Sequence, residues 1–116
     1  MTSIRWRFYR TANGRDIVRE ELETLGVHGR AAVVAAMKRV ARNRHFPYEQ
    51  EHIGGELCAV RIFLDGSTFR VLYARQGVHD HILLGLHVFQ KKDRKLPIRA
   101  RQLAERRLRD WRSRAT

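Results

Sequence analysis

Three apolar runs in the second half of the chain constrain the fold more than any other feature. They span Leu57–Leu64, Thr68–Ala74 and His81–Phe89, and each is rich in Val, Ile, Leu, Phe or Tyr. Asp65-Gly66-Ser67 joins the first two runs with residues that favour a hairpin turn. The third run is apolar on both faces, which predicts an inner strand. The three runs therefore predict an antiparallel meander.

The first half of the chain predicts one strand followed by two helices. Ile4–Phe8 alternates apolar and basic side chains, the pattern of a half-buried strand. After the turn signal Asn13-Gly14, apolar residues recur at helical spacing over Val18–Leu25, and Gly26 stands where a helix commonly ends. A second apolar stripe runs from Gly29 to about Arg44. We expect these two helices to form an antiparallel hairpin on one face of a sheet.

A last helix completes the predicted domain. Pro97 can open it, and a narrow apolar stripe follows at spacings of four, four and three residues, formed by Ala100, Ala104, Leu108 and Trp111. The order strand, two helices, three strands, helix predicts an α+β domain with its helices on one side of an antiparallel sheet. We expect residues 1–116 to form a single domain, because a chain of this length cannot bury two separate cores.

Basic residues concentrate at the C-terminal end of the chain. Residues 91–116 hold eleven of the 24 Lys and Arg residues but only three of the 12 acidic ones, in a chain of net charge +12. Such a footprint favours a polyanionic partner, either nucleic acid or an acidic protein. The alternative is a solvated helix face with local ion pairs such as Glu105 with Arg109.

Several classes of protein do not fit the sequence. Arg5, Arg7 and Arg10 interrupt the apolar residues at the start of the chain, and no run is long enough to cross a membrane. We therefore expect a cytoplasmic protein without a membrane partner. The lone Cys58 cannot form an internal disulfide, and no Cys or His pair has the spacing of a zinc site. We expect no metal or cofactor, and a packing role for Cys58.

Cationic side chains on the predicted strands form the candidate site. Arg61 and Arg70 each interrupt an apolar run, and a charge in such a place costs free energy unless a partner compensates it. The hairpin can bring both guanidinium groups to one face, and His87 on the next strand can join them. Lys91 and Lys92 follow that strand and add positive charge.

This set suits RNA cleavage in which the ribose 2′-hydroxyl attacks the adjacent phosphate without a metal. The reaction needs a proton acceptor, a proton donor for the leaving 5′-oxygen, and cations that stabilise the charge of the transition state. His87 is suited to acid or base catalysis, and Arg61 and Arg70 can bind phosphate through two hydrogen bonds each. Lys91 or Lys92 can neutralise charge.

Further residues are candidates for RNA binding. Phe89 or Tyr73 can stack on an exposed base. Arg94 and Lys95 extend the basic segment and are expected to contact the RNA backbone.

Four blocks of the sequence carry a family resemblance. They are Gly55–Arg61, Phe69–Ala74, Leu83–Lys92, and Lys95-Leu96-Pro97 followed by Ala104. In these blocks the chain resembles the phage-derived, HigB-like (Gp49-like) branch of the RelE/ParE toxin superfamily. Cys58 stands where this family often shows an aromatic residue, a departure that removes no candidate catalytic group.

The resemblance implies a compact RelE-like fold and the toxin of a type II toxin–antitoxin system. It implies an endoribonuclease that cleaves messenger RNA in the ribosomal A site, and so inhibits translation and arrests growth. The implied partner is a cognate antitoxin, commonly a helix-turn-helix protein like HigA. Residue by residue, the family's strand arginine, phosphate-binding arginine, last-strand histidine and basic pair match Arg61, Arg70, His87, Lys91 and Lys92.

Alternative functions and alternative roles for these residues remain open. The chain can instead be a ParE-like inhibitor of DNA gyrase, or a module that binds nucleic acid without cleaving it. His87 and Phe89 can be core residues, and the two arginines can form salt bridges with Glu56 or Asp65.

Overall fold

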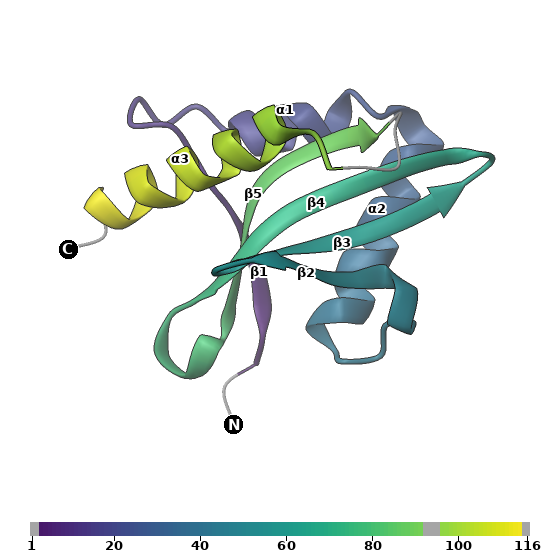
Figure 1. The fold of residues 1–116 in the computed structure, drawn as a ribbon, viewed down its shortest axis with the longest axis horizontal. Coiled ribbons are helices and arrows are strands. Elements are labelled where there is room, and N and C mark those ends of the chain that lie inside the picture. The colour runs from purple at the N-terminus through teal and green to yellow at the C-terminus, as the bar shows by residue number, and fades with distance from the viewer. Residues whose placement is uncertain (1–2, 92–95, 115–116) are drawn as a thin grey trace.

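The computed structural model describes residues 3–91 and 96–114. Its helices and strands, shown in Figure 1, are β1 (Arg5–Phe8), α1 (Ile17–Glu23), α2 (Gly26–Ala41), β2 (Gln50–Gly54), β3 (Leu57–Leu64), β4 (Ser67–Gln76), β5 (Ile82–Lys91) and α3 (Ile98–Arg114). Short 3-10 helices occur at Pro47–Glu49 and Val78–Asp80. The predicted α+β class is confirmed.

The strands form one mixed sheet in the order β1-β5-β4-β3-β2. The predicted meander is confirmed, because β3 pairs antiparallel with β4, and β4 pairs antiparallel with β5. β5 is an inner strand, as its apolar character predicts. β1 differs from the expected antiparallel sheet, since it pairs parallel with β5. The helices α1 and α2 lie between β1 and β2 and return the chain so that β2 runs opposite to β1. The three antiparallel pairings that follow then bring β5 parallel to β1.

The pattern of the sequence did not predict β2. Its residues, Gln50–Gly54, are mostly polar, and the strand pairs on one side only, with β3. Its register shifts between His52 and Gly54. A short edge strand with an irregular register lacks the alternation that identifies a half-buried strand.

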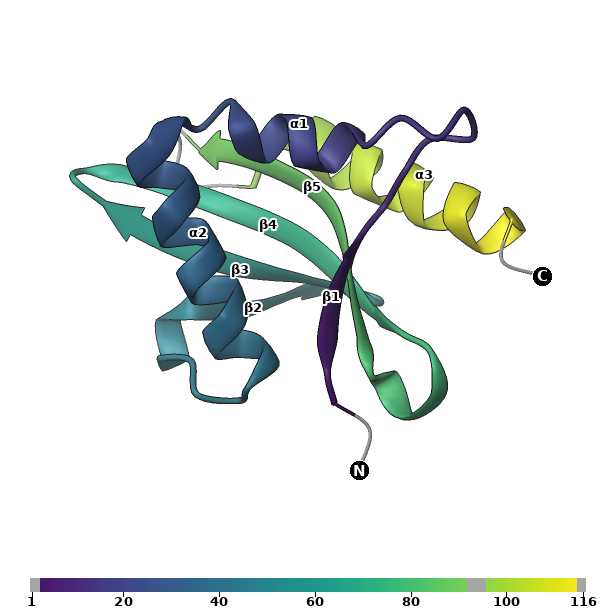
Figure 2. The same ribbon diagram turned by 180° about the vertical axis from the view of Figure 1, so that it is seen from behind.

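Two helices cover one face of the sheet and the third lies on the other. In Figure 2, α1 runs beside β5 and α2 crosses β3 and β4, and the two helices diverge from Gly26. Figure 1 shows α3 in front of the opposite face. The expectation that all helices share one side is therefore wrong for α3. Its buried side chains are Ala100, Ala104, Arg107 and Leu108, and the two alanines let the helix pack closely against β4 and β5.

Part of the basic C-terminal run fastens α3 to the domain. Arg107 pairs with Glu21, Arg112 pairs with Glu56, and Arg114 donates to the backbone carbonyl oxygen of Arg10. Glu105 pairs with Arg101 rather than with the expected Arg109. None of the helices in the described ranges has both the length and the apolar character needed to span a membrane. The basic run is thus partly structural, and its charge cannot all be assigned to a ligand.

Candidate catalytic site

The strand register brings the candidate residues to one face of the sheet. Arg61 on β3 stands opposite Arg70 on β4, which stands opposite Phe89 on β5. Directly opposite residues point to the same face, so these three side chains form one row across the sheet. His87 and Lys91 lie two residues before and after Phe89, and therefore share its face. We call this side of the sheet, which also carries α3, the site face.

A carboxylate that the sequence did not single out lies beside both arginines. Glu51 on β2 stands opposite Ala59, which places it on the site face. Its Oε2 is 3.0 Å from Nη1 of Arg70 and 3.7 Å from Nε of Arg61. The expected partners of the arginines, Glu56 and Asp65, do not serve this role. Glu51 lies on β2, a strand that the sequence pattern did not predict.

Arg70 is a buried cation with unused hydrogen-bonding capacity. Only 5% of its surface is exposed. Burial lowers the pKa of its guanidinium; the charge of Glu51 opposes this and the charge of Arg61 adds to it. Its buried Nε has no hydrogen-bond partner among the described residues. Because buried donors without a partner are costly, the position favours a bound anion that would accept from Nε.

Arg61 is held at the rim of the same cluster. Its Nε donates a hydrogen bond of 3.0 Å to the backbone carbonyl oxygen of Tyr48, and the side chain is only partly buried. This contact leaves the remaining guanidinium donors available. Arg61 and Arg70 together therefore offer donors at two depths of the same face, an arrangement that suits the several oxygens of a phosphate.

His87 is fixed by a carboxylate from α1. Its Nδ1 lies 3.0 Å from Oε1 of Glu21, and the same oxygen accepts a 3.1 Å hydrogen bond from the backbone N–H of Val88. Arg107 of α3 reaches Oε2 of Glu21 at 2.9 Å and donates to the carbonyl oxygen of Leu86. Burial raises the pKa of Glu21, but His87, Val88 and Arg107 outweigh it, so the net pKa lies below its ordinary value.

These contacts determine which nitrogen of His87 carries a proton toward α1. A carboxylate with a lowered pKa stays ionised and can only accept, so Nδ1 of His87 donates to Glu21. That leaves Nε2 for other proton transfers. Phe89 stacks on the imidazole ring, with centroids 4.9 Å apart and an interplanar angle of 19°. Glu21 and Phe89 together restrict the orientation of the imidazole.

A groove leads to the cluster from the side of α3. It has a volume of about 490 Å³ and lies between β2 and the first half of α3. Glu51 and Ile53 form the sheet side, and Arg101 and Glu105 belong to the helix side. An extended ligand lying in this groove would reach the carboxylate that contacts Arg70.

Not every predicted site residue joins this cluster. Lys91 is on the site face and is largely buried. Tyr73 is fully buried on the face that α2 covers, where it accepts a hydrogen bond from Gln50 and packs edge-on against Trp6. It therefore cannot stack on a base, and this prediction is wrong. Three other predicted residues lie outside the described residues, namely Lys92, Arg94 and Lys95.

Comparisons with known proteins found two kinds of similarity. A family model described as phage-derived protein Gp49-like (DUF891) matches residues 20–109. The chain is also similar to proteins named "Probable endoribonuclease HigB1" from Mycobacterium tuberculosis strains CDC 1551 / Oshkosh and ATCC 25618 / H37Rv. Each is 29% identical over 93 residues, which cover 79% of this chain and 72% of the relative. The region matched by the family model contains Glu21, Glu51, Arg70 and His87.

Proposed function

Because the chain belongs to the phage-derived protein Gp49-like family, we propose that it is the toxin of a type II toxin–antitoxin system and an endoribonuclease. Its substrate is messenger RNA on the ribosome, and cleavage inhibits translation and growth. Its partner is a cognate antitoxin, a helix-turn-helix protein of the HigA type. The name of the Mycobacterium tuberculosis relatives supports the class of reaction.

One observation carries the proposal, namely the carboxylate of Glu51 at 3.0 Å from the buried guanidinium of Arg70. A carboxylate that can accept a proton thus lies beside a guanidinium group that can bind phosphate, and this carboxylate lines the groove between β2 and α3. General base catalysis requires such a group within hydrogen-bond reach of the proton that it removes. The two arginines would hold the scissile phosphate, and Glu51 would accept the proton of the ribose 2′-hydroxyl.

The remaining steps use residues of the same face. The 2′-oxygen attacks the phosphorus while the bond from phosphorus to the 5′-oxygen breaks. His87 gives its Nε2 proton to that leaving oxygen, so the products are a 2′,3′-cyclic phosphate and a 5′-hydroxyl end. His87 lies two residues along β5 from the position opposite Arg70, about 7 Å in an extended strand. Arg61, Arg70 and Lys91 would stabilise the extra negative charge of the transition state. All three roles are filled by side chains, so the reaction needs no metal.

The proposal is tested by cleavage of an end-labelled messenger in the presence of EDTA. The purified protein is assayed with and without programmed ribosomes, alongside Arg70→Ala. We expect cuts only with ribosomes, and none with the variant. Mapping the ends should find a cyclic phosphate and a free 5′-hydroxyl.

A matched control separates the site from general loss of charge. Glu56 is exposed and pairs with Arg112 away from the site, so Glu56→Gln should cut normally while Glu51→Gln should not. Circular dichroism checks that each variant is folded. An intact messenger with the unmodified protein would contradict the proposal, and inhibition of gyrase supercoiling would then identify the ParE-like alternative.

A further inference from the structure

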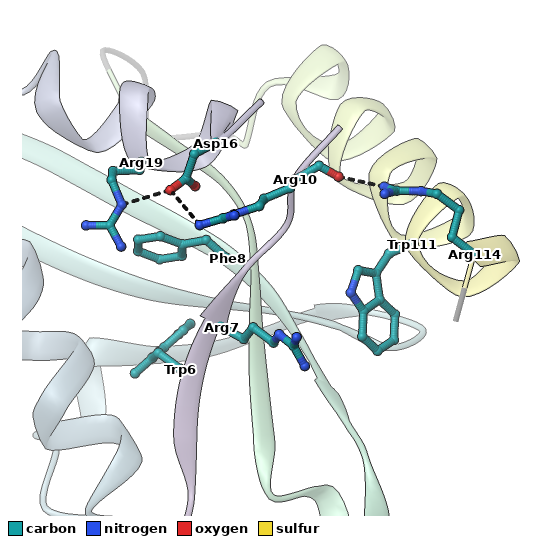
Figure 3. Close-up of a pocket in the computed structure, with 8 residues that line it drawn as sticks. All are labelled: Trp6, Arg7, Phe8, Arg10, Asp16, Arg19, Trp111 and Arg114. Carbon is teal, nitrogen blue, oxygen red and sulfur yellow. Dashed lines mark hydrogen bonds and ion pairs between the residues drawn. The ribbon is translucent and has the colours of Figure 1, made fainter. Parts of the chain in front are cut away.

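A second hollow lies at the unpaired edge of β1. Within the described part of the chain, β1 pairs only with β5, which leaves its other edge uncovered. The hollow, of about 630 Å³, is bounded by β1, the start of α1 and the end of α3 (Figure 3). We call it the β1-edge groove. Its basic side chains are Arg7, Arg10, Arg19 and Arg114.

Most of these guanidinium groups are held in place by neighbours. Arg19 and Arg10 both contact Oδ2 of Asp16, at 2.9 and 3.5 Å. Arg114 donates to the backbone carbonyl oxygen of Arg10 at 2.6 Å and pairs with Asp110. Arg7 is exposed and forms no ion pair with any residue that the structure describes. The lining has four arginines and a single carboxylate, Asp16, so the groove carries an excess of positive charge.

Flat aromatic faces lie among these charges. Phe8 lies beneath Arg19, whose guanidinium carbon is 5.6 Å from the ring centroid. Trp111, which is only partly buried, reaches the groove from α3. Figure 3 shows the side chains of Arg7 and Trp111 on the same side of β1. The groove therefore offers apolar faces and cationic groups within one hollow.

We propose that the β1-edge groove binds a segment of single-stranded RNA. A ligand that uses both features must carry flat rings and negative charge, and unpaired nucleotides carry both. A base would stack on Trp111, and phosphates would contact Arg7 and Arg10. An acidic protein segment would use the arginines but leave the aromatic faces without a matching surface. The choice of RNA rests on the proposed function, whereas the groove itself does not.

The groove is separate from the catalytic site but lies within reach of the same strand of RNA. Phe8 pairs with Gly85, whereas Arg70 stands opposite Phe89. These two positions on β5 are about 13 Å apart at the rise of an extended strand. One RNA can therefore be held in the groove while another part of it lies at Arg70. The groove would add affinity without taking part in the chemistry.

The test is binding of a short fluorescein-labelled 2′-O-methyl oligouridine, measured by fluorescence anisotropy. This probe lacks the 2′-hydroxyl and cannot be cleaved by the proposed reaction. The variants are Trp111→Ala and Arg7→Ala, with Arg5→Ala as the matched control. Arg5 lies on the same strand and face as Arg7 and is also exposed, but it does not line the groove.

Trp111→Ala loses one stacking platform, so its Kd for the oligouridine should be roughly 5- to 150-fold higher than that of the unmodified protein. Arg7→Ala should weaken binding and reduce the slope of log Kd against log salt by about 0.7, more than Arg5→Ala does. Arg7 is exposed, so that variant reports on the groove even if Trp111→Ala is unstable.

Two results would overturn the inference. If Arg5→Ala and Arg7→Ala have equal effects and Trp111→Ala has none, binding depends on net charge and not on the groove. If the oligouridine does not bind but a labelled oligoglutamate peptide does, in a manner that depends on Arg7, the groove accepts an acidic protein segment. Failure of the proposed function would instead leave messenger uncut by the unmodified protein, an outcome that this binding assay does not depend on.

Discussion

Glu21 of α1 and His87 of β5, 66 residues apart in sequence, lie 3.0 Å apart between Oε1 and Nδ1. The same carboxylate accepts from the backbone of Val88 and pairs with Arg107 of α3. One acidic side chain thus joins two helices to the strand that carries the candidate catalytic histidine. Its removal should affect both stability and chemistry, and the two effects can be measured separately.

Glu21→Gln should lower the free energy of unfolding at neutral pH by about 1.5–3 kcal/mol, the usual worth of hydrogen bonds to a charged group. The pKa of Glu21 in the folded protein lies below its ordinary value of 4.5, so its ionised form favours folding above that pH. This contribution is lost as the pH falls through the folded-state pKa. The variant should therefore lose less stability on acidification than the unmodified protein. Urea unfolding at neutral and acidic pH measures this. Glu23→Gln, an exposed change on the same helix, is the control, and an equal pH dependence in all three proteins would refute the role of Glu21.

Arg70→Ala should reduce ribosome-dependent cleavage by about 100- to 1000-fold, as expected when one contact to a charged transition state is removed. Arg70→Lys should recover only part of this loss, because an ammonium group keeps the charge but not the planar pair of donors. Single-turnover rates of cleavage measure both the loss in the alanine variant and the partial recovery in the lysine variant. Full activity in the alanine variant would remove Arg70 from the site.

Glu51→Gln should separate proton transfer from phosphate binding. The amide oxygen can still accept from Arg70, but it cannot take the proton of the 2′-hydroxyl, so cleavage should fall by roughly 100- to 10,000-fold. The affinity for a non-cleavable RNA should be unchanged or higher, because the variant lacks the negative charge beside Arg70 and Arg61. Cleavage kinetics and fluorescence anisotropy on the same variant give the two results. Parallel loss of binding and cleavage would mean that Glu51 only positions the arginines.

Tyr73→Phe should leave cleavage unchanged and lower the free energy of unfolding by about 0.5–1.5 kcal/mol. The change removes the hydroxyl that accepts from Nε2 of Gln50 at 2.7 Å, and leaves that amide without its partner. Thermal or urea unfolding detects the loss. A drop in cleavage larger than the drop in folded protein would indicate that Tyr73 does act in the site after all.

The sequence predicted the parts of the fold in which apolar residues recur with a clear period. The hairpin turn and the runs of β3, β4 and β5 identified the meander, and the register in the structure confirms that the hairpin brings Arg61 and Arg70 to one face. The family inferred from four sequence blocks is confirmed by the match to residues 20–109. The features that the pattern did not predict lie in segments without a clear apolar pattern, or in segments far along the chain from the candidate site.

Tyr73 and the two glutamates show why the site was only partly predictable. β4 is buried on both faces over Phe69–Ala74, so its pattern does not reveal which side chains share the face of Arg70. Glu51 lies on a polar edge strand without a clear signal. Glu21 reaches the site through tertiary packing of α1 against β5, which local sequence does not encode.

Arg107 and its neighbour Arg106 offer the sharpest test of how α3 is attached. Arg107 is 8% exposed, donates to the carbonyl oxygen of Leu86 at 2.8 Å and pairs with Glu21, whereas Arg106 is exposed and has no ion pair with the described residues. Arg107→Met keeps the length of the side chain but leaves a partly buried carboxylate and a buried carbonyl oxygen without this donor. It should lower the free energy of unfolding by about 3–5 kcal/mol, while Arg106→Met should change it by about 0.5 kcal/mol or less. Both variants remove one positive charge from adjacent positions of the same helix, so net charge cannot explain a difference between them. Equal stabilities in urea would show that the link between α3, Glu21 and β5 contributes nothing to the fold, and a shared loss of RNA binding would assign both arginines to the basic surface instead.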